Sequence, residues 1–194
     1  MKKIKFGSVF IGLFMNACLS GDPFTKTVEA VNLDHYLGTW YVIANRPTMF
    51  ETDAYNATET YSLNQETKKI DVDFRYRKGG FNGVEKTVPQ TAWIYNKKTN
   101  AHWKIAPWRW FSFINFDYLI LDLDINYQWT VVGVPNQKYL WVMSRDPHMT
   151  DDLLSKILDR IKISGYNISD VTRVPQKINS MTLIILVEPE LRLV

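Results

Sequence analysis

Cysteine and histidine are scarce in this sequence, which has one Cys and three His among 194 residues. A single cysteine excludes an internal disulfide framework and a cysteine-rich zinc site. The three histidines, His35, His102 and His148, share no metal-ligand spacing. We therefore expect no metal site and no cofactor.

A strong excess of one charge is also absent. The chain has 23 basic and 20 acidic residues, a net charge of +3, and no basic stripe. This balance excludes a typical nucleic-acid-binding protein. The glycine-rich residues 79–83 precede a predicted strand and lack the Lys-Ser/Thr of a phosphate-binding loop, so they indicate a hairpin turn. No nucleophile motif appears, and we expect a protein that is not an enzyme.

Apolar and aromatic residues, by contrast, are plentiful. The chain is 46% hydrophobic and 14% aromatic, with 7 Trp, 10 Tyr and 10 Phe. Disordered and low-complexity chains are poor in aromatics, so this composition excludes them. A length of 194 residues is typical of one domain.

The N-terminus has the pattern of a targeting segment. A few lysines precede the apolar run 6–17, which is too short for a membrane span of about 20 residues. We interpret residues 1–17 as a secretory signal peptide. Ala17 followed by Cys18 resembles the bacterial lipobox, in which the cysteine is lipidated and becomes the mature N-terminus. The sequence thus predicts a lipidated tether over 18–33 that attaches the protein to a membrane, and the alternative is a secreted protein without a lipid anchor.

The body of the chain has the pattern of consecutive β-strands. In residues 69–77, Ile70, Val72, Phe74 and Tyr76 alternate with charged residues, which predicts a strand with one buried face. Seven further strands are predicted, at residues 40–45, 57–63, 84–95, 101–106, 116–124, 128–134 and 139–145. Short strands without intervening helices favour an antiparallel barrel or sandwich. Eight strands closed into a barrel leave room for one small ligand.

One helix follows the strands. Thr150 suits its N-cap and Gly165 its end. Its apolar face is expected to contain Leu153, Leu154, Ile157, Leu158 and Ile161. We expect this helix to pack on the outside of the barrel and a last short strand to follow at residues 170–174.

Two motifs at the ends of the strand series carry a family resemblance. Gly-Thr-Trp-Tyr at residues 38–41 opens the first strand, and Leu-Trp-Val-Met-Ser-Arg at residues 140–145 ends the eighth. Over residues 34–175 the chain resembles the lipocalin family, in particular its bacterial outer-membrane lipoprotein branch, akin to apolipoprotein D. The resemblance implies an all-β fold, an eight-stranded antiparallel up-and-down barrel with one C-terminal α-helix packed outside. It also implies a structural signature, Gly38, Trp40 and Arg145, with the guanidinium on the indole face at the closed end.

The resemblance implies a function as well. A lipid-anchored lipocalin of the outer membrane, facing the periplasm or the cell surface, would bind, store or transport a fatty acid or lysophospholipid in its calyx. It leaves a homodimer open. The candidate ligand-binding residues come from the aromatic-rich middle and late strands: Trp93, Trp110, Phe111, Tyr118, Trp129 and Trp141. Alternation does not decide which face of 116–125 points inward, because both faces are apolar.

Two alternatives have other functions. One is an enzyme that modifies lipids on a lipocalin barrel, although the only cysteine lies at the signal junction and is not available inside the barrel. The other is a scaffold whose barrel is filled by its own aromatics and whose partner is a protein. Residues 176–194 form an extension of unknown role beyond the family resemblance.

Overall fold

The computed structural model describes residues 23–48, 51–108 and 113–177 of the chain. The predicted signal peptide and most of the C-terminal extension lie outside these ranges. So do three of the predicted site residues, Cys18, Trp110 and Phe111.

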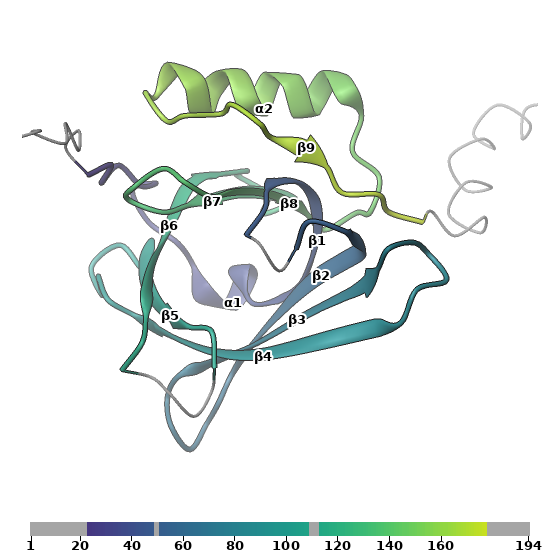
Figure 1. The fold of residues 1–194 in the computed structure, drawn as a ribbon. Helices are drawn as coiled ribbons and strands as arrows, with labels where there is room; N and C mark the ends of the chain where they lie inside the picture. Colours follow the sequence, from purple (N-terminus) through teal and green to yellow (C-terminus); the bar gives the residue numbers. More distant parts are fainter. Residues whose placement is uncertain (1–22, 49–50, 109–112, 178–194) are drawn as a thin grey trace, which may run out of the picture.

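Eight strands form a closed antiparallel barrel (Figure 1). Their bounds are β1 (Gly38–Arg46), β2 (Ala54–Leu63), β3 (Ile70–Lys78), β4 (Glu85–Ile94), β5 (His102–Ala106), β6 (Phe116–Leu123), β7 (Trp129–Gly133) and β8 (Leu140–Ser144). Each strand pairs with the next one in the chain, and β8 pairs back with β1 to close the barrel. The predicted up-and-down barrel is therefore confirmed.

Alternation decides which side chains point into the barrel. In β3 the four apolar side chains at even positions are buried in the interior cluster, as their period of two predicts. Strand β6 is apolar on both faces for a different reason. Tyr118 and Ile120 belong to the interior cluster, whereas Leu119 belongs to a second cluster on the outside, where a helix covers the barrel.

The covering element is α2 (Asp151–Ile163), which lies across the outside of the barrel (Figure 1). It begins at the predicted N-cap, where the Thr150 hydroxyl accepts a hydrogen bond from the Leu153 amide at 3.3 Å. Of its apolar residues, Leu154, Ile157 and Ile161 are buried in the outer cluster. Leu153, which is also predicted on the apolar face, is 36% exposed and is not part of the outer cluster.

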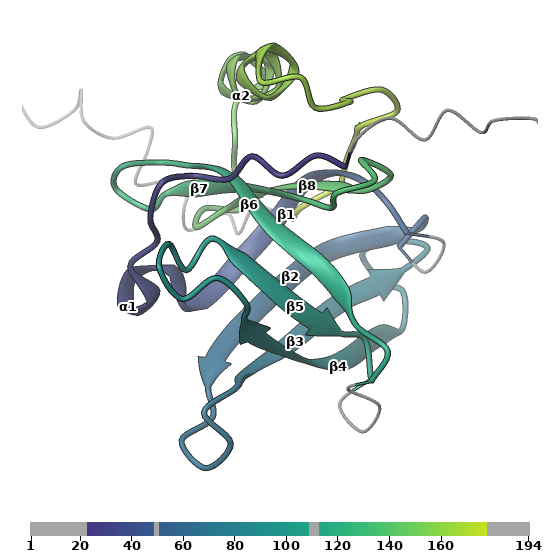
Figure 2. The same ribbon diagram turned by 90° about the vertical axis from the view of Figure 1, so that its left-hand side faces the viewer.

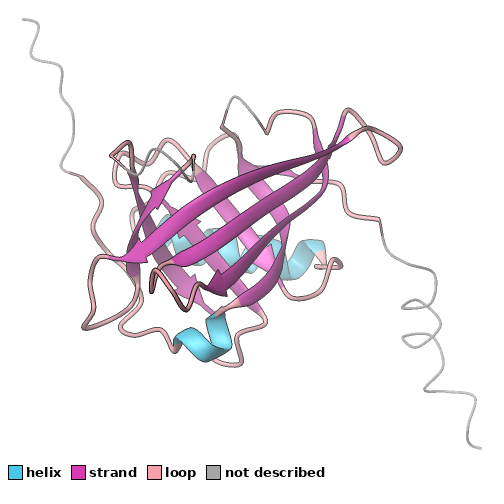
Figure 3. Ribbon diagram, turned by 90° about the horizontal axis from the view of Figure 1, so that it is seen from below, coloured by secondary structure: helices cyan, strands magenta, loops and turns pink. Residues whose placement is uncertain are grey.

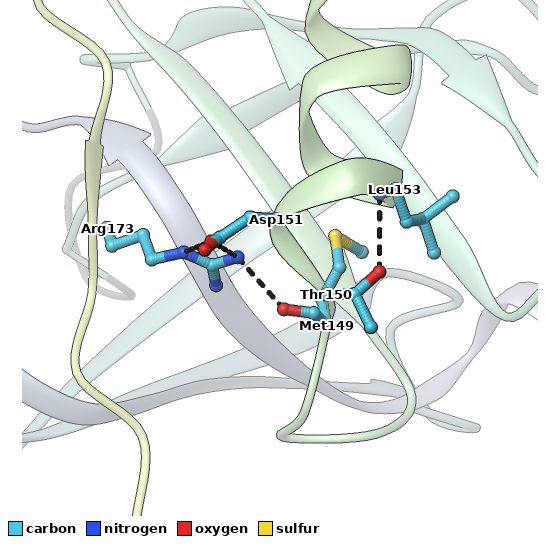
Figure 4. Close-up of polar contacts among 5 residues, drawn as sticks. All are labelled: Met149, Thr150, Asp151, Leu153 and Arg173. Atoms are coloured by element: carbon cyan, nitrogen blue, oxygen red, sulfur yellow. Dashed lines mark hydrogen bonds and ion pairs between the residues drawn. The ribbon is translucent and has the colours of Figure 1, made fainter.

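A short ninth strand, β9 (Thr172–Arg173), pairs with β1 at Ala44 and Asn45. Figure 4 shows how it is tied to the start of α2. The Arg173 guanidinium donates to Asp151 Oδ1 at 2.6 Å and to the Met149 carbonyl at 2.9 Å. The last predicted strand thus lies beside the barrel.

The N-terminal segment before α1 runs along the barrel from one end to the other (Figure 2). Its amides donate to backbone carbonyls at three positions along the barrel: Phe24 to Pro135, Val28 to Ile120 and Val31 to Thr99. Phe24 and Val31 are buried. The described part of the predicted tether over 18–33 therefore contacts the barrel at Phe24, Val28 and Val31.

Helix α1 (Leu33–Tyr36) lies at the end of the barrel where β1 begins (Figures 1 and 3). Its Tyr36 side chain is fully buried in the interior cluster. We call this end the closed end and the opposite end, where β1 leads into β2, the open end. Within the described ranges no helix is long and apolar enough to cross a membrane.

Candidate functional site

The closed end is held by a stacked tryptophan and arginine. The Arg145 guanidinium carbon lies 3.6 Å from the centre of the Trp40 ring, and the Trp40 side chain is fully buried. Arg145 also donates hydrogen bonds of 2.7–2.9 Å to four backbone carbonyls between His35 and Thr39. The pair therefore joins α1 and the first strand to the end of the eighth.

Gly38 leaves space for this arrangement. Its φ is +98°, a conformation that favours glycine, and a Cβ atom there would lie 3.4 Å from Arg145 Nη1. Two residues later, the Trp40 indole donates to the Tyr36 carbonyl at 2.8 Å. The three residues of the predicted signature thus act together on the backbone of the closed end.

Next to this pair, four aromatic side chains form a layer that we call the aromatic floor: Tyr36, Tyr61, Trp103 and Tyr118. Trp103 and Tyr118 are stacked, with ring centres 5.4 Å apart and 17° between the planes. Tyr36 meets Trp103 edge-on at 5.4 Å. These contacts fill the barrel interior near the closed end with protein atoms.

The hydroxyl groups of the aromatic floor form a hydrogen-bonded chain that ends on a carboxyl group. The Tyr36 and Tyr118 hydroxyls are 3.2 Å apart, and those of Tyr118 and Tyr61 are 2.7 Å apart. The Tyr61 hydroxyl donates to Glu59 Oε2. Burial disfavours the charged carboxylate and raises the pKa of Glu59 to about 7. Burial also raises the pKa of the Tyr61 and Tyr118 phenols well above 10, so both are neutral at physiological pH.

A second carboxyl group, Glu51, lies nearer the open end, between β1 and β2. Its Oε2 accepts hydrogen bonds from the Trp141 indole at 3.1 Å, the Thr48 amide at 3.2 Å and the Asn45 amide at 3.4 Å. Burial raises the pKa of Glu51, and the hydrogen bonds oppose that shift. The interior side of the barrel therefore contains two acids at different heights.

Apolar side chains continue along the interior from the aromatic floor toward the open end. Trp40, Trp103 and Tyr36 near the closed end have no accessible surface, whereas Tyr76 of β3 keeps 9%. Further along, Val88 and Trp141 are only partly buried although they pack against the interior cluster. Because these residues are apolar, the wall beyond the aromatic floor is suited to an apolar molecule.

The structure separates the described ligand-binding candidates into two pairs. Tyr118 and Trp141 pack in the interior, the first in the aromatic floor and the second beside Glu51. Trp93 points outward, since its neighbours on β4 pack inward, and it lines an outer groove where Lys69 Nζ lies 5.3 Å from its ring. Trp129 packs under α2 in the outer cluster, with the Arg160 guanidinium 5.4 Å from its ring.

Trp93 and Trp129 thus correct the prediction that they face a ligand inside the barrel. The physical reason is that the outside of this barrel also buries aromatic side chains, beneath α2 and beside long lysine side chains. Composition and strand position do not distinguish such a residue from one that faces inward.

Neither Glu59 nor Glu51 is among the site residues predicted from the sequence. For Glu59 a signal exists in the alternation of β2, where Ala57 and Tyr61 share its face while Thr58 and Thr60 occupy the other. An acid on the more apolar face of a strand indicates a buried carboxyl group. Glu51 lies outside any strand, so no periodic pattern reveals it.

The interior offers polar groups for hydrogen bonding. Among the described residues, no group of three or more His, Cys, Asp or Glu is arranged to hold a metal ion. Among the groups that face the interior are carboxyls, phenols and an indole, which can bind a polar atom of a ligand by donating or accepting a hydrogen bond.

A closed antiparallel barrel that is sealed at one end and lined with apolar side chains defines a class of single-domain barrels that enclose one small molecule. The chain belongs to the lipocalin family, since the family model of the lipocalin-like domain matches residues 31–176.

Curated relatives agree with this family. Outer membrane lipoprotein Blc of Escherichia coli K12 is 29% identical over 169 residues, covering 82% of this chain and 89% of that protein. Blc of Vibrio cholerae is 26% identical and covers 87% of this chain and 96% of that protein. Temperature-induced lipocalin-1 of Arabidopsis thaliana is 26% identical, with 78% and 82% covered. The resemblance to the bacterial outer-membrane lipoprotein branch is confirmed.

Solved structures show the same fold. Per a 4 from cockroaches superposes with a TM-score of 0.59 at 20% identity, covering 81% of this chain and 96% of that chain. Insecticyanin from the tobacco hornworm Manduca sexta has a TM-score of 0.59 at 16% identity, covering 83% and 88%. At these identities the likeness concerns the fold alone.

Proposed function

We propose that this lipocalin binds one hydrophobic ligand, a fatty acid or a lysophospholipid, in the open half of its barrel and stores or transports it unchanged. The observation that carries the proposal is a closed barrel with an apolar interior. The aromatic floor fills the closed half, and apolar residues such as Phe74, Tyr76 and the partly buried Trp141 line the interior toward the open end. Burial of an acyl chain against this wall stabilises the complex by about 0.8 kcal/mol per methylene.

A fatty-acid titration tests this proposal. A soluble form that begins after Cys18 keeps every described residue, and hexadecanoic acid should quench its Trp fluorescence with saturation at one ligand per barrel. Removing two methylenes from the ligand should weaken binding by up to about 1.6 kcal/mol, roughly 15-fold. The lipid should be recovered unchanged.

Three results would contradict the binding function. Affinity that is independent of chain length would show that the chain lies outside the barrel. Recovery of a modified lipid would favour the enzyme alternative. Absence of any saturable binding would favour the scaffold alternative, in which aromatic side chains fill the barrel.

We further propose that the protein is anchored to the outer membrane through a lipid on Cys18. The relatives named outer membrane lipoprotein support this location, and the small residue Ala17 before the cysteine suits processing at that position. The first hydrogen bond from the described N-terminal segment to the barrel, from the Phe24 amide to the Pro135 carbonyl, lies at the open end. An anchor only a few residues upstream would therefore keep the open end within reach of the membrane.

Replacing Cys18 with alanine should release the protein from membranes or leave the precursor uncleaved. The reason is that alanine cannot be lipidated, and stable anchoring needs more than one acyl chain. Membrane fractionation and the mass of the N-terminal fragment measure both effects. Ser20→Ala, two residues away, is the matched control and should leave both unchanged. Normal processing together with full membrane retention of the Cys18 variant would contradict lipidation.

A further inference from the structure

Glu59 has a position from which it can act on a ligand. Its side chain belongs to β2 and lies between Trp40 of β1 and Phe74 of β3 in the strand register. Trp40 marks the closed end, and Phe74 belongs to the apolar interior wall beyond the aromatic floor. Glu59 itself is 8% exposed. The carboxyl group therefore lies where the aromatic floor meets the apolar wall that leads toward the open end.

The two oxygens of this carboxyl group have different surroundings. Oε2 accepts the hydroxyl of Tyr61, which continues to Tyr118 and Tyr36. Oε1 has no hydrogen-bond partner among the described residues. Among the described residues, every polar side-chain atom that is fully buried has a hydrogen-bond partner. Oε1 is therefore not sealed by protein atoms, and it can accept a hydrogen bond from a molecule inside the barrel.

The charged and titratable groups around Glu59 leave its negative charge uncompensated. The groups that face it are the phenols of Tyr61, Tyr118 and Tyr36, from β2, β6 and α1, and the Glu51 carboxyl from the segment between β1 and β2. Its neighbours on β1 and β3, Trp40 and Phe74, carry no charge. Among these groups there is no cation to pair with a carboxylate. The site thus favours a hydrogen-bond donor over a second carboxylate.

We propose that Glu59 Oε1 determines ligand specificity by accepting a hydrogen bond from a donor, such as a hydroxyl group, at the end of the ligand that enters the barrel first. This inference rests on the proposed function, since it assumes that a long-chain amphiphile enters the open half. A carboxylate head group then stays at the open end. The preferred ligand is an otherwise apolar chain whose buried end carries a hydroxyl group.

The test compares three ligands of equal chain length: hexadecanoic acid, 16-hydroxyhexadecanoic acid and 2-hydroxyhexadecanoic acid. A hydroxyl group buried without a partner weakens binding strongly, so the 16-hydroxyl reports whether a partner exists. The native protein should bind 16-hydroxyhexadecanoic acid at least as tightly as hexadecanoic acid. In Glu59→Leu the ratio of the two dissociation constants should shift by at least tenfold against the hydroxylated chain.

Two controls isolate the effect. The 2-hydroxyl lies beside the head group, so its effect on affinity should be the same in the native protein and in Glu59→Leu. Glu66→Leu removes an exposed acid between β2 and β3, and it should keep the native ratio for all three ligands. An unchanged ratio in folded Glu59→Leu overturns the inference.

A titration with the native protein covers the case in which Glu59→Leu does not fold. Because a carboxylate accepts a stronger hydrogen bond than a neutral carboxyl group, the preference for the 16-hydroxyl should rise at least threefold between pH 6 and pH 8. The head group is common to both ligands and cancels in the ratio. A ratio that does not change with pH overturns the inference.

The outcomes also separate this inference from the proposed function. If hexadecanoic acid binds but Glu59 does not affect the ratio, the lipid-binding function stands and the role of Glu59 is wrong. If only the 16-hydroxylated ligand binds, the role of Glu59 stands and simple fatty acids are not the ligand. If neither ligand binds, both are wrong.

Discussion

Trp40→Ala is expected to lower the free energy of unfolding by about 3–5 kcal/mol, the usual cost of deleting a large buried aromatic side chain. The Trp40 side chain is fully buried, packs 5.3 Å from the Tyr36 ring and lies under the Arg145 guanidinium. Its removal leaves a cavity next to the aromatic floor and takes away the hydrogen bond to the Tyr36 carbonyl. Urea denaturation followed by circular dichroism measures the loss.

The contact with Arg145 can be measured separately by a double-mutant cycle with Arg145→Ala. A cation over an indole contributes about 0.5–2 kcal/mol in a poorly solvated site, so the two substitutions should couple by that amount. Arg160→Ala is the matched control, because the Arg160 guanidinium lies 5.4 Å from a different ring, that of Trp129. It should not couple to Trp40. Additive losses from Trp40→Ala and Arg145→Ala would show that the stacked pair adds no stability.

Glu59→Gln is expected to raise the free energy of unfolding relative to that of the native protein, and this gain should be about 3 kcal/mol larger at pH 8 than at pH 4. Burial raises the pKa of Glu59 from 4.5 to about 7. Between these two values the unfolded chain has released the proton that the folded protein still binds. The stability of the native protein therefore falls as the pH rises from about 4.5 to 7 and stays constant above. Glutamine does not ionise, but it keeps an oxygen that accepts the Tyr61 hydroxyl.

Thermal or urea unfolding across pH 4–8 measures this difference between the native protein and Glu59→Gln. Burial also raises the pKa of Glu51, but Glu51 is present in both proteins and its contribution largely cancels. Glu66→Gln, at an exposed position, should follow the native profile. Parallel profiles for the native protein and Glu59→Gln would show that Glu59 ionises as easily in the folded state as in the unfolded state.

Much of the fold follows from local patterns in the sequence. The alternation at Ile70, Val72, Phe74 and Tyr76 predicts β3 and its inward face, because successive side chains of a strand point to opposite sides. Thr150 predicts the start of α2, since its hydroxyl satisfies an amide of the first helical turn. These patterns are decided within a few residues.

Part of the candidate site could not be predicted, for a reason visible in particular residues. Trp93, Trp129 and Trp141 all lie in strands and all are partly or largely buried, yet only Trp141 packs in the interior. The outer face is covered in part by α2, so burial of an aromatic side chain does not indicate which face it occupies. Burial of an aromatic side chain is favourable in free energy on either face of the sheet.

The sequence by itself determined the strand series, the capped helix and the two motifs that identify the family, because each depends on spacing along a short stretch of chain. The tertiary structure alone decided that Glu59 meets the chain of phenols. Tyr61 and Tyr118 are 57 residues apart in sequence and come from opposite parts of the barrel wall, yet their hydroxyls are 2.7 Å apart. Closure of the barrel brings them together, and the burial that results raises the pKa of Glu59 to about 7.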